Sequence, residues 1–320
     1  MGAPEEVVPG IWQLGLELSE EVPLFLHAVV GRDGAALVDG GLPGNLPDAD
    51  RLLAAAGVAA EPGAPGIPLH WLLNTHAHHD HIGTFGPLRR RAGARVVAAP
   101  GAVPWLEDLE RNLREFALHR PDIIPDTAEL RAELAPTYGE PCPVDVAMTG
   151  GGSVRLGGGT VLEAVELPGH VPAELGWWER STRTLLLGDA VTGTSWSFFH
   201  GHLLPSAYRA SLRRLRALTE AEGVRLVVMS HRPACGAADF LRLLDAVERY
   251  LDEVTATVES ALSDVPVTLR QVWRNTCSAM GRVEEFRGLA MVAAHLDEAV
   301  AAGRARRVQP DGYLAVRSRR

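Results

Sequence analysis

Four histidines and one aspartate lie within six consecutive positions, from 76 to 81, of this 320-residue chain. The segment His76-Ala77-His78-His79-Asp80-His81 follows an apolar run at 69–73, which predicts a buried strand, and precedes a run at 82–90 that predicts the start of a helix. These apolar flanks distinguish it from the solvated histidine-rich loops of tags and low-complexity tracts. We therefore expect the cluster to lie on a strand-to-helix turn.

The spacing within this cluster is typical of metal ligands. In extended backbone, residues two apart point to the same side, so His76 and His78 can approach one cation together. The turn that follows directs Asp80 and His81 towards a second cation. Because neutral imidazole nitrogens and carboxylate oxygens bind zinc and other divalent first-row metals, the sequence predicts a metal site here.

Three more candidate ligands follow short apolar runs further along the chain. His170 comes at the end of a predicted hairpin, and Asp189 and His231 each come directly after a predicted strand. A single histidine or aspartate at such a position is equally suited to forming or capping a turn. Their order after the histidine cluster is what favours a functional role.

The N-terminal half of the chain predicts an α/β fold. Short apolar segments at 11–16, 24–30 and 35–39, separated by turn residues, predict a meander of strands. A helix is predicted at 48–56 and another strand at 95–99, so strands and helices alternate around the cluster.

A change of pattern follows, since residues 101–142 contain short helical pieces broken by prolines. We interpret this segment as an insertion over the sheet. It is either a lid or substrate wall near the metals or a peripheral helical pack, and loop arguments do not separate the two.

The chain resembles the metallo-β-lactamase-fold hydrolase superfamily over about residues 8–235. The resemblance rests on four motifs in this order: His76-x-His78-x-Asp80-His81, Pro168-Gly169-His170, Gly188-Asp189-Ala190 and His231 after a strand. It implies a four-layer αβ/βα sandwich, in which two mixed sheets face each other, helices lie outside and the metal site lies at one edge. The expected domains are a catalytic domain at 1–236 and a C-terminal region at 237–320.

The resemblance also implies a dinuclear site. It assigns two Zn²⁺ ions per chain, with iron or manganese as alternative metals. It gives Asp80 and Asp189 catalytic roles beside a metal-bound hydroxide. By position, the first metal would be held by His76, His78 and His170, the second by Asp80, His81 and His231, and Asp189 would bridge both.

Two residues near the cluster have less certain roles. The resemblance assigns no metal to His79, which is expected either to fill space beside the site or to contact a ligand without binding a metal. Asp39 matches a buried aspartate near the site in relatives, which suggests a contact with a ligand; an Asx cap on the turn after its strand is an equally good interpretation.

An aromatic loop follows Asp189, at 192–205. Such a loop next to metals suits an apolar acyl group, although ordinary packing under the next helix explains it as well. His202 also competes with His231 as the last ligand, and we prefer His231 because it ends a strand. The candidate substrate residues are Trp196, Phe198, Phe199, His200 and His202.

The common zinc β-lactamases usually have a cysteine in the second metal site. This chain has Asp80 there, and in this respect it resembles the glyoxalase II, lactonase, thioesterase and nuclease branches. The sequence departs from the family pattern at 171–174 and 230–233. We expect these residues at the rim of the metal site, where they affect the identity of the substrate and not metal binding. We predict a dinuclear zinc hydrolase that uses a metal-bridging hydroxide to cleave an acyl thioester or ester of a small molecule or carrier. Lactone hydrolysis is an alternative, and an iron redox enzyme or a non-catalytic metal binder is a more distant one.

The C-terminal region predicts helices with one apolar face, followed by a hairpin at 307–316. This order resembles a winged-helix appendage. It supports a rival hypothesis, an RNA or DNA phosphodiesterase, and its alternatives are a cap on the sandwich or a homodimer contact. A net charge of −9 argues against general nucleic-acid binding. The arginines that favour it are Arg304, Arg306, Arg307, Arg317, Arg319 and Arg320.

The three cysteines form no C-x-x-C pair, and the acidic N-terminus is followed by no long apolar segment. We therefore expect a cytoplasmic protein without a membrane partner.

Overall fold

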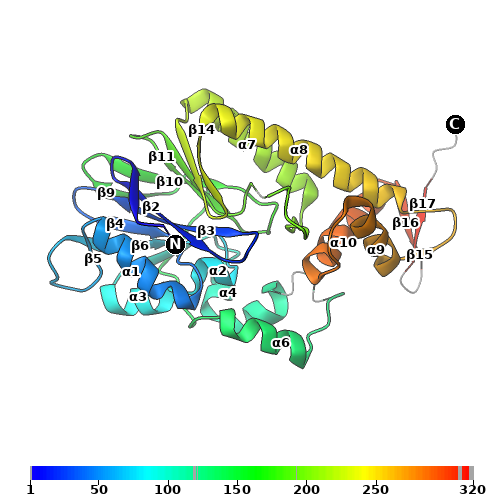
Figure 1. Ribbon diagram of the computed structural model, residues 1–320, viewed down its shortest axis with the longest axis horizontal. Coiled ribbons are helices and arrows are strands. Elements are labelled where there is room, and N and C mark those ends of the chain that lie inside the picture. The colour runs from blue at the N-terminus through cyan, green and yellow to red at the C-terminus, as the bar shows by residue number, and fades with distance from the viewer. Residues whose placement is uncertain (1, 118–119, 121, 192, 309–311, 317–320) are drawn as a thin grey trace.

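Two mixed β-sheets lie face to face in the molecule, with helices outside both of them (Figure 1). The computed structural model describes residues 2–117, 120, 122–191, 193–308 and 312–316. This architecture confirms the predicted αβ/βα sandwich.

The first sheet comes from the N-terminal half of the chain, in the order β1-β2-β3-β4-β6-β7-β8, with β5 beside β6. The predicted meander is its antiparallel part, β1 to β4, and the pairings from β4 to β8 are parallel. The strands are β1 (Glu5–Val8), β2 (Ile11–Glu17), β3 (Pro23–Val30), β4 (Ala35–Val38), β5 (Val58–Ala59), β6 (Ile67–Leu73), β7 (Arg95–Ala98) and β8 (Val146–Ala147).

The second sheet has the order β14-β13-β12-β11-β10-β9. Its pairings are antiparallel except for β12 with β13, which is parallel. The strands are β9 (Ser153–Gly157), β10 (Thr160–Glu166), β11 (Leu175–Glu179), β12 (Thr184–Leu187), β13 (Leu226–Met229) and β14 (Arg232–Gly236).

Apolar side chains on both faces explain why the inner strands are continuous hydrophobic runs. Successive residues of a strand point to opposite faces. Trp177 and Leu186 therefore lie in the core between the sheets, whereas Trp178, Leu185 and Leu187 lie in a second core under the outer helices. Burial on both sides requires helices outside the sheet.

Helices cover both outer faces. Contacts join α1 (Leu46–Ala55) and α3 (Phe85–Ala92) to the first sheet and α8 (Ala237–Ser260) to the second, while α7 (Pro205–Glu222) packs beside α8. Helix α7 begins with proline and ends before Gly223 in a left-handed conformation, which is the usual order of start and stop residues. Two short elements complete this part, a 3₁₀ turn (Pro43–Asn45) and α2 (His79–Ile82).

Parallel pairing places the predicted ligands at one edge of the sandwich. Val38 at the end of β4 pairs with Leu73 at the end of β6, so Asp39 and the histidine cluster emerge together. In the second sheet Leu187 pairs with Met229, which brings the segments that carry Asp189 and His231 side by side. The strand ends thus define the site.

The insertion at 101–142 is helical, as expected, and lies below the first sheet in Figure 1. Its described elements are α4 (Val103–Glu107), α5 (Leu109–Asn112), a π-helical turn (Leu113–Ala117), α6 (Ala128–Leu134) and a 3₁₀ turn (Ala135–Thr137).

Helix α8 extends from the second sheet into the C-terminal region (Figure 1). There it packs against α9 (Leu269–Met280) and α10 (Phe286–Ala301), next to a sheet in the order β15-β17-β16. The strands are β15 (Val267–Thr268), β16 (Ala305–Val308) and β17 (Gly312–Ala315). Asp311 of the expected hairpin turn and Arg317, Arg319 and Arg320 lie outside the described residues, and the winged-helix interpretation stays a prediction.

Helix α10 is buried along most of its length, since residues 288–296 are all buried. A helix that is apolar all round belongs to a core. Within the described part of the chain, no helix has the length and apolar character needed to cross a membrane.

Candidate metal centre

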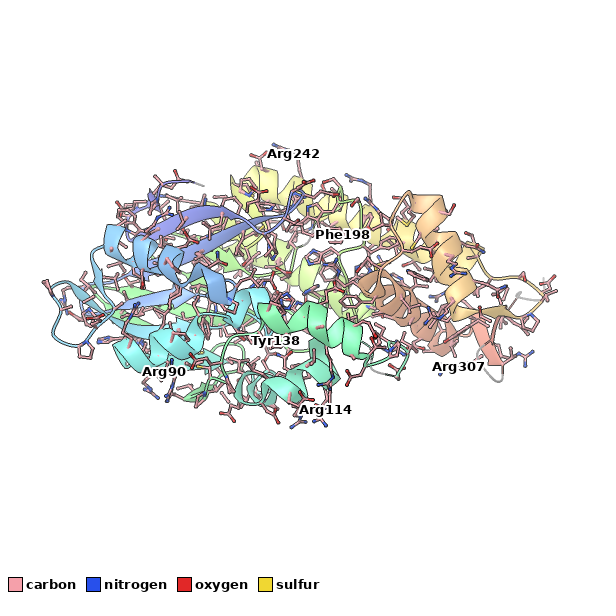
Figure 2. The ribbon with its side chains drawn as sticks, turned by 60° about the horizontal axis from the view of Figure 1, so that its bottom comes forward. Arg90, Arg114, Tyr138, Phe198, Arg242 and Arg307 are labelled. Atoms are coloured by element: carbon pink, nitrogen blue, oxygen red, sulfur yellow. The ribbon has the colours of Figure 1, made fainter. Side chains whose placement is uncertain are left out.

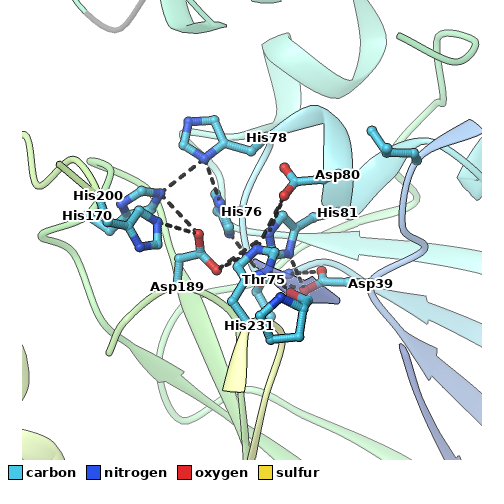
Figure 3. A network of polar contacts seen from close by, with 12 residues as sticks. Asp39, Thr75, His76, His78, Asp80, His81, His170, Asp189, His200 and His231 are labelled. Carbon is cyan, nitrogen blue, oxygen red and sulfur yellow. Dashed lines mark hydrogen bonds and ion pairs between the residues drawn. The ribbon is translucent and has the colours of Figure 1, made fainter. Parts of the chain in front are cut away.

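All seven predicted ligands converge at the edge of the sandwich (Figure 3). They form two groups, and within each group the ligand atoms lie within 4.8 Å of one another. The groups correspond to the predicted division, with Asp189 in the first. They are His76, His78, His170 and Asp189, and Asp80, His81 and His231.

In four of the five histidines of these two groups, Nδ1 points away from the cluster and contacts an oxygen atom. In His170 and His231 that oxygen is a backbone carbonyl, of Gly201 and of Pro23 respectively, the latter at 2.8 Å. A carbonyl only accepts hydrogen bonds, so Nδ1 carries the proton and the Nε2 lone pair points into the cluster. The outward contacts therefore select the tautomer that binds a metal through Nε2.

The same argument extends to His76 and His81 through Asp39. Its Oδ2 accepts the Thr75 hydroxyl at 2.7 Å and lies 2.8 Å from His81 Nδ1. Because the Thr75 hydroxyl donates to Asp39, its oxygen is left to accept from His76 Nδ1, 3.1 Å away. Asp39 Oδ1 also accepts the Thr75 backbone N–H at 2.8 Å. The structure thus places Asp39 in contact with a predicted ligand, and its backbone adopts a left-handed φ of 55°.

His78 has the opposite ring orientation. Its Nδ1 faces the cluster, 2.9 Å from His76 Nε2 and 3.1 Å from His170 Nε2. Nitrogens bound tetrahedrally to one zinc ion, each about 2.0–2.1 Å from it, are about 3.3 Å apart. The three nitrogens therefore have the spacing of a set that shares one ion.

Asp189 lies between the two groups, and each of its oxygens faces one of them. Oδ2 lies 2.9 Å from His200 Nε2 and 3.5 Å from His170 Nε2. Oδ1 lies 3.4 Å from His231 Nε2 and 3.5 Å from His81 Nε2. This geometry suits a carboxylate that bridges two cations.

The two groups differ in their electrostatics. Burial lowers the pKa of His170 to about 3, so its ring is neutral. Burial also acts to lower the pKa of His81, but the carboxylates of Asp39, Asp80 and Asp189 outweigh it and raise that pKa to about 10. In the metal-free chain the carboxylate-rich side of the centre therefore holds a proton where a cation would bind.

Two buried atoms show that these residues fit a metal. His81 Nε2 and Asp189 Oδ1 form an ion pair 3.5 Å apart, but neither atom makes a hydrogen bond to a described residue. A buried polar atom without a hydrogen bond is unfavourable by about 1–3 kcal/mol. Both atoms are ligand types for divalent metals and face the same space, so the residues suit a divalent metal site.

Glu174 is a residue of the centre that the sequence argument placed wrongly. We expected residues 171–174 at the rim, but Glu174 is 2% exposed and its Oε1 accepts the Asp189 backbone N–H at 2.8 Å. The polypeptide turns inward here because Leu175 N bonds to the Thr75 carbonyl at 2.8 Å. A charged residue one position before an apolar strand was the only available signal.

A cavity of about 530 Å³ opens beside the centre. Three of the candidate substrate residues, Trp196, Phe198 and His200, line it. Phe199 and His202 do not: Phe199 is fully buried in the core of the C-terminal region, and His202 is buried against His295, 2.7 Å away.

The insertion forms part of the cavity wall through Glu133, Leu134 and Thr137. It also supports the metal-binding turn, because Asn112 Nδ2 donates to the Ala77 carbonyl at 3.0 Å. Of the two interpretations left open, the structure shows a wall beside the metal centre.

His79 lies outside both ligand groups and lines the cavity. Its ring centroid is 5.9 Å from that of Tyr138, in the insertion. His79 therefore contributes to the cavity surface rather than to the ligand set.

Comparison with known proteins agrees with this geometry. Residues 27–231 match the family model described as the metallo-beta-lactamase superfamily. The protein YobT of Bacillus subtilis (strain 168) is 25% identical over 180 residues, which are 56% of this chain and 66% of YobT, slightly under two thirds of that relative.

Solved structures share the fold. A metallo-beta-lactamase family protein from Thermus thermophilus has a TM-score of 0.73 and 21% identity, covering 97% of this chain and 100% of that chain. A beta-lactamase domain protein from Burkholderia ambifaria has a TM-score of 0.68 and 20% identity, covering 98% and 93%. A subclass B3 metallo-beta-lactamase of Bradyrhizobium japonicum has a TM-score of 0.58 and 18% identity, covering 80% and 94%.

Proposed function

The chain belongs to the metallo-β-lactamase superfamily, and we propose that it cleaves an acyl thioester or ester of a small molecule or carrier at a pair of zinc ions. The family and the cluster of histidine and aspartate side chains support a metal-dependent hydrolase in general. The acyl substrate and the two zinc ions are the proposed refinements.

The observation that carries the acyl substrate is the aromatic surface beside the metal centre. The Trp196 ring centroid lies 4.7 Å from that of His200 and 6.3 Å from that of His231. Phe198 stacks on Trp196, with ring centroids 5.5 Å apart. An apolar acyl group can lie on these rings with its carbonyl at the centre, and burial of its methylenes supplies binding energy.

The ligand residues would hold the two ions as the two groups predict. Bound there, the ions would lower the pKa of water towards neutrality and polarise the carbonyl oxygen. The residues of the chain orient the centre: Asp39 and the carbonyls of Pro23 and Gly201 keep His81, His231 and His170 in the binding tautomer. The aromatic surface positions the acyl group and excludes water from it.

The nuclease hypothesis gains no support from the described residues. In a helix-turn-helix or winged-helix domain, the second helix of the helix-turn-helix commonly binds in the groove of the nucleic acid. The corresponding helix here, α10, is buried from 288 to 296 and presents no such face. The net charge of −9 also opposes a polyanionic substrate.

The test is release of free thiol from a panel of acyl thioesters by the zinc-loaded protein. We expect turnover by the wild type and its loss, by at least about a hundredfold, in Asp189→Ala. An exposed aspartate changed in the same way, Asp33→Ala, serves as the control. If no thioester or ester is cleaved while a lactone or RNA is, the proposal is wrong and the corresponding alternative replaces it.

A further inference from the structure

The first turn of α10 brings a guanidinium group to the cavity of the metal centre. Phe286 and Arg287 both line this cavity, although the C-terminal region contributes no ligand among its described residues. The Arg287 Cζ lies 4.4 Å from the centroid of the Phe198 ring. Figure 2 shows Phe198 in the middle of the molecule, where its loop meets the C-terminal region.

A series of ring contacts along the aromatic surface connects the metal centre to Arg287. Trp196 packs against the rings of His200 and His231, Phe198 stacks on Trp196, and the guanidinium lies over Phe198. A molecule bound along this surface would have one end at the metals and the other at a fixed positive charge.

The guanidinium is held in position but retains free donors. Its Nε donates to Glu285 Oε2 at 2.7 Å, and Glu285 also caps α10 through the backbone N–H groups of Arg287 and Gly288. The terminal nitrogens of Arg287 make no hydrogen bond to any residue that the structure describes, and the side chain is 40% exposed. Two parallel N–H groups of this kind match a carboxylate.

The rest of the cavity wall would direct an anion to this position. Among the described lining residues, Arg287 is the one arginine, and no lysine is present. Glu133 lines the wall supplied by the insertion, and Asp80 and Asp189 lie at the metal end. A carboxylate on a substrate would be repelled by these acids wherever metals do not neutralise them, and attracted by Arg287.

We propose that Arg287 binds a carboxylate of the substrate. This inference rests on the proposed function and narrows it: the substrates are thioesters or esters in which an apolar stretch, lying along Trp196 and Phe198, separates the scissile bond from an anionic end. Arg287 is then a specificity-determining residue rather than a catalytic one. The carboxylate can belong to the acyl group or to the thiol.

The test compares isosteric substrates that differ by one charge. Thioesters carrying a terminal carboxylate on the acyl chain are assayed beside the same compounds with a terminal carboxamide, and a second pair carries the two groups on the thiol. The proteins are the wild type, Arg287→Gln, Arg287→Lys and the control Arg242→Gln. Arg242 is a 70% exposed arginine on α8 (Figure 2).

In one of the two pairs, we expect the kcat/KM of the wild type to be at least about tenfold higher for the carboxylate than for the carboxamide, through a lower KM. A hydrogen bond to a charged group contributes enough binding free energy for this difference. Arg287→Gln should lose this preference and cleave the carboxamide as the wild type does. Arg287→Lys should keep part of it, and Arg242→Gln all of it. The pair that shows the preference identifies which side of the scissile bond carries the acid.

Three outcomes would contradict the proposal. Equal turnover of carboxylate and carboxamide in both pairs would exclude the anion site while leaving the hydrolase intact. A preference that persists in Arg287→Gln, with an unchanged unfolding midpoint, would assign it to another residue. Turnover of no thioester or ester at all would instead refute the proposed function, and with it this refinement.

Discussion

Glu174 lies directly behind Asp189, and its Oε1 accepts the Asp189 backbone N–H at 2.8 Å. Its other oxygen is buried and makes no hydrogen bond to a described residue. Burial first, and then the charge of Asp189, raise the pKa of Glu174 well above its usual range. Burial thus favours the neutral form of this carboxyl, and its Oε1 fixes the backbone of the predicted bridging ligand.

Replacing Glu174 tests this supporting role. Glu174→Gln retains an acceptor of the same size, so zinc content should match the wild type. Glu174→Ala leaves the Asp189 N–H without a partner and opens a small cavity, which should lower the free energy of unfolding by about 2–4 kcal/mol. Chemical denaturation and zinc analysis of both variants are the measurements. Equal stability of the two variants would show that the hydrogen bond has no such role.

The same residue predicts a pH dependence in the metal-free protein. Because the folded pKa of Glu174 is raised, its contribution to stability is complete below the unfolded pKa of about 4.3 and decreases as pH rises towards the folded value. Glutamine does not titrate. The stability of Glu174→Gln relative to the wild type should therefore increase as pH rises above the unfolded pKa of about 4.3, as measured by denaturation at each pH. A constant or decreasing difference would contradict the raised pKa.

Asp39→Asn should weaken the second metal group. Two donors, the Thr75 hydroxyl and His81 Nδ1, converge on the Asp39 carboxylate, whose other oxygen accepts the Thr75 N–H. In asparagine, one of the two carboxylate oxygens is replaced by an NH₂ group, which cannot accept a hydrogen bond. At least one of these donors therefore loses its acceptor. We expect about 10–100-fold weaker zinc binding at this group. Competition with a chromophoric chelator measures it, with the exposed Asp33→Asn as control; unchanged affinity would assign Asp39 to turn formation only.

Zinc binding should release a proton from His81 and none from His170. His81, with a pKa of about 10, is protonated at pH 7 and must lose that proton to bind zinc, whereas His170, with a pKa of about 3, is already neutral. The apparent affinity of the group containing His81 should therefore rise about tenfold per pH unit below about pH 9. Calorimetry in two buffers of different ionisation enthalpy counts the protons. Binding of both ions without proton release would contradict the assignment.

Gly169→Ala should disturb the backbone immediately before His170, where the chain packs closely against α7. A Cβ at this position would lie 2.5 Å from the Tyr208 Cα in α7, and the φ of Gly169 is +156°. Backbone has to move, so we expect a loss of about 2–4 kcal/mol in unfolding free energy. Gly93→Ala is the matched control, because its φ is +68° and nothing lies within 4 Å; it should lose about 1 kcal/mol. Similar losses in both would show that steric contact with α7 is unimportant.

The clustering of the candidate ligands could be predicted from the sequence because these residues follow strands. Hydrophobic runs indicate the strands, and parallel pairing brings their ends to one edge, as in Val38 with Leu73 and Leu187 with Met229. His76 and His231 follow the ends of β6 and β13 by a few residues, and His170 follows the end of β10, so their positions relative to the strands could be read from the hydrophobic runs. The sandwich and its metal edge follow from this pattern together with the family resemblance.

The loop at 193–204 could not be predicted in the same way. It has no regular period, so the sequence does not determine which of its side chains face the cavity. Phe198 faces it, whereas Phe199 is buried in the C-terminal core. Glu174 escaped notice because a glutamate is usually exposed, and only the tertiary contact with Asp189 explains its burial. Arg287 was equally hidden, since it reaches the centre from a helix far beyond the last ligand in the sequence.

The most direct test of the account is a count of zinc ions per chain by native mass spectrometry, after zinc loading and removal of excess metal. The two ligand groups predict two ions in the wild type. They predict a single retained ion in His231→Ala, because that change affects only the group of Asp80, His81 and His231. A wild-type chain that retains one ion or none, or a His231→Ala variant that retains two with unchanged affinity, would contradict the dinuclear centre.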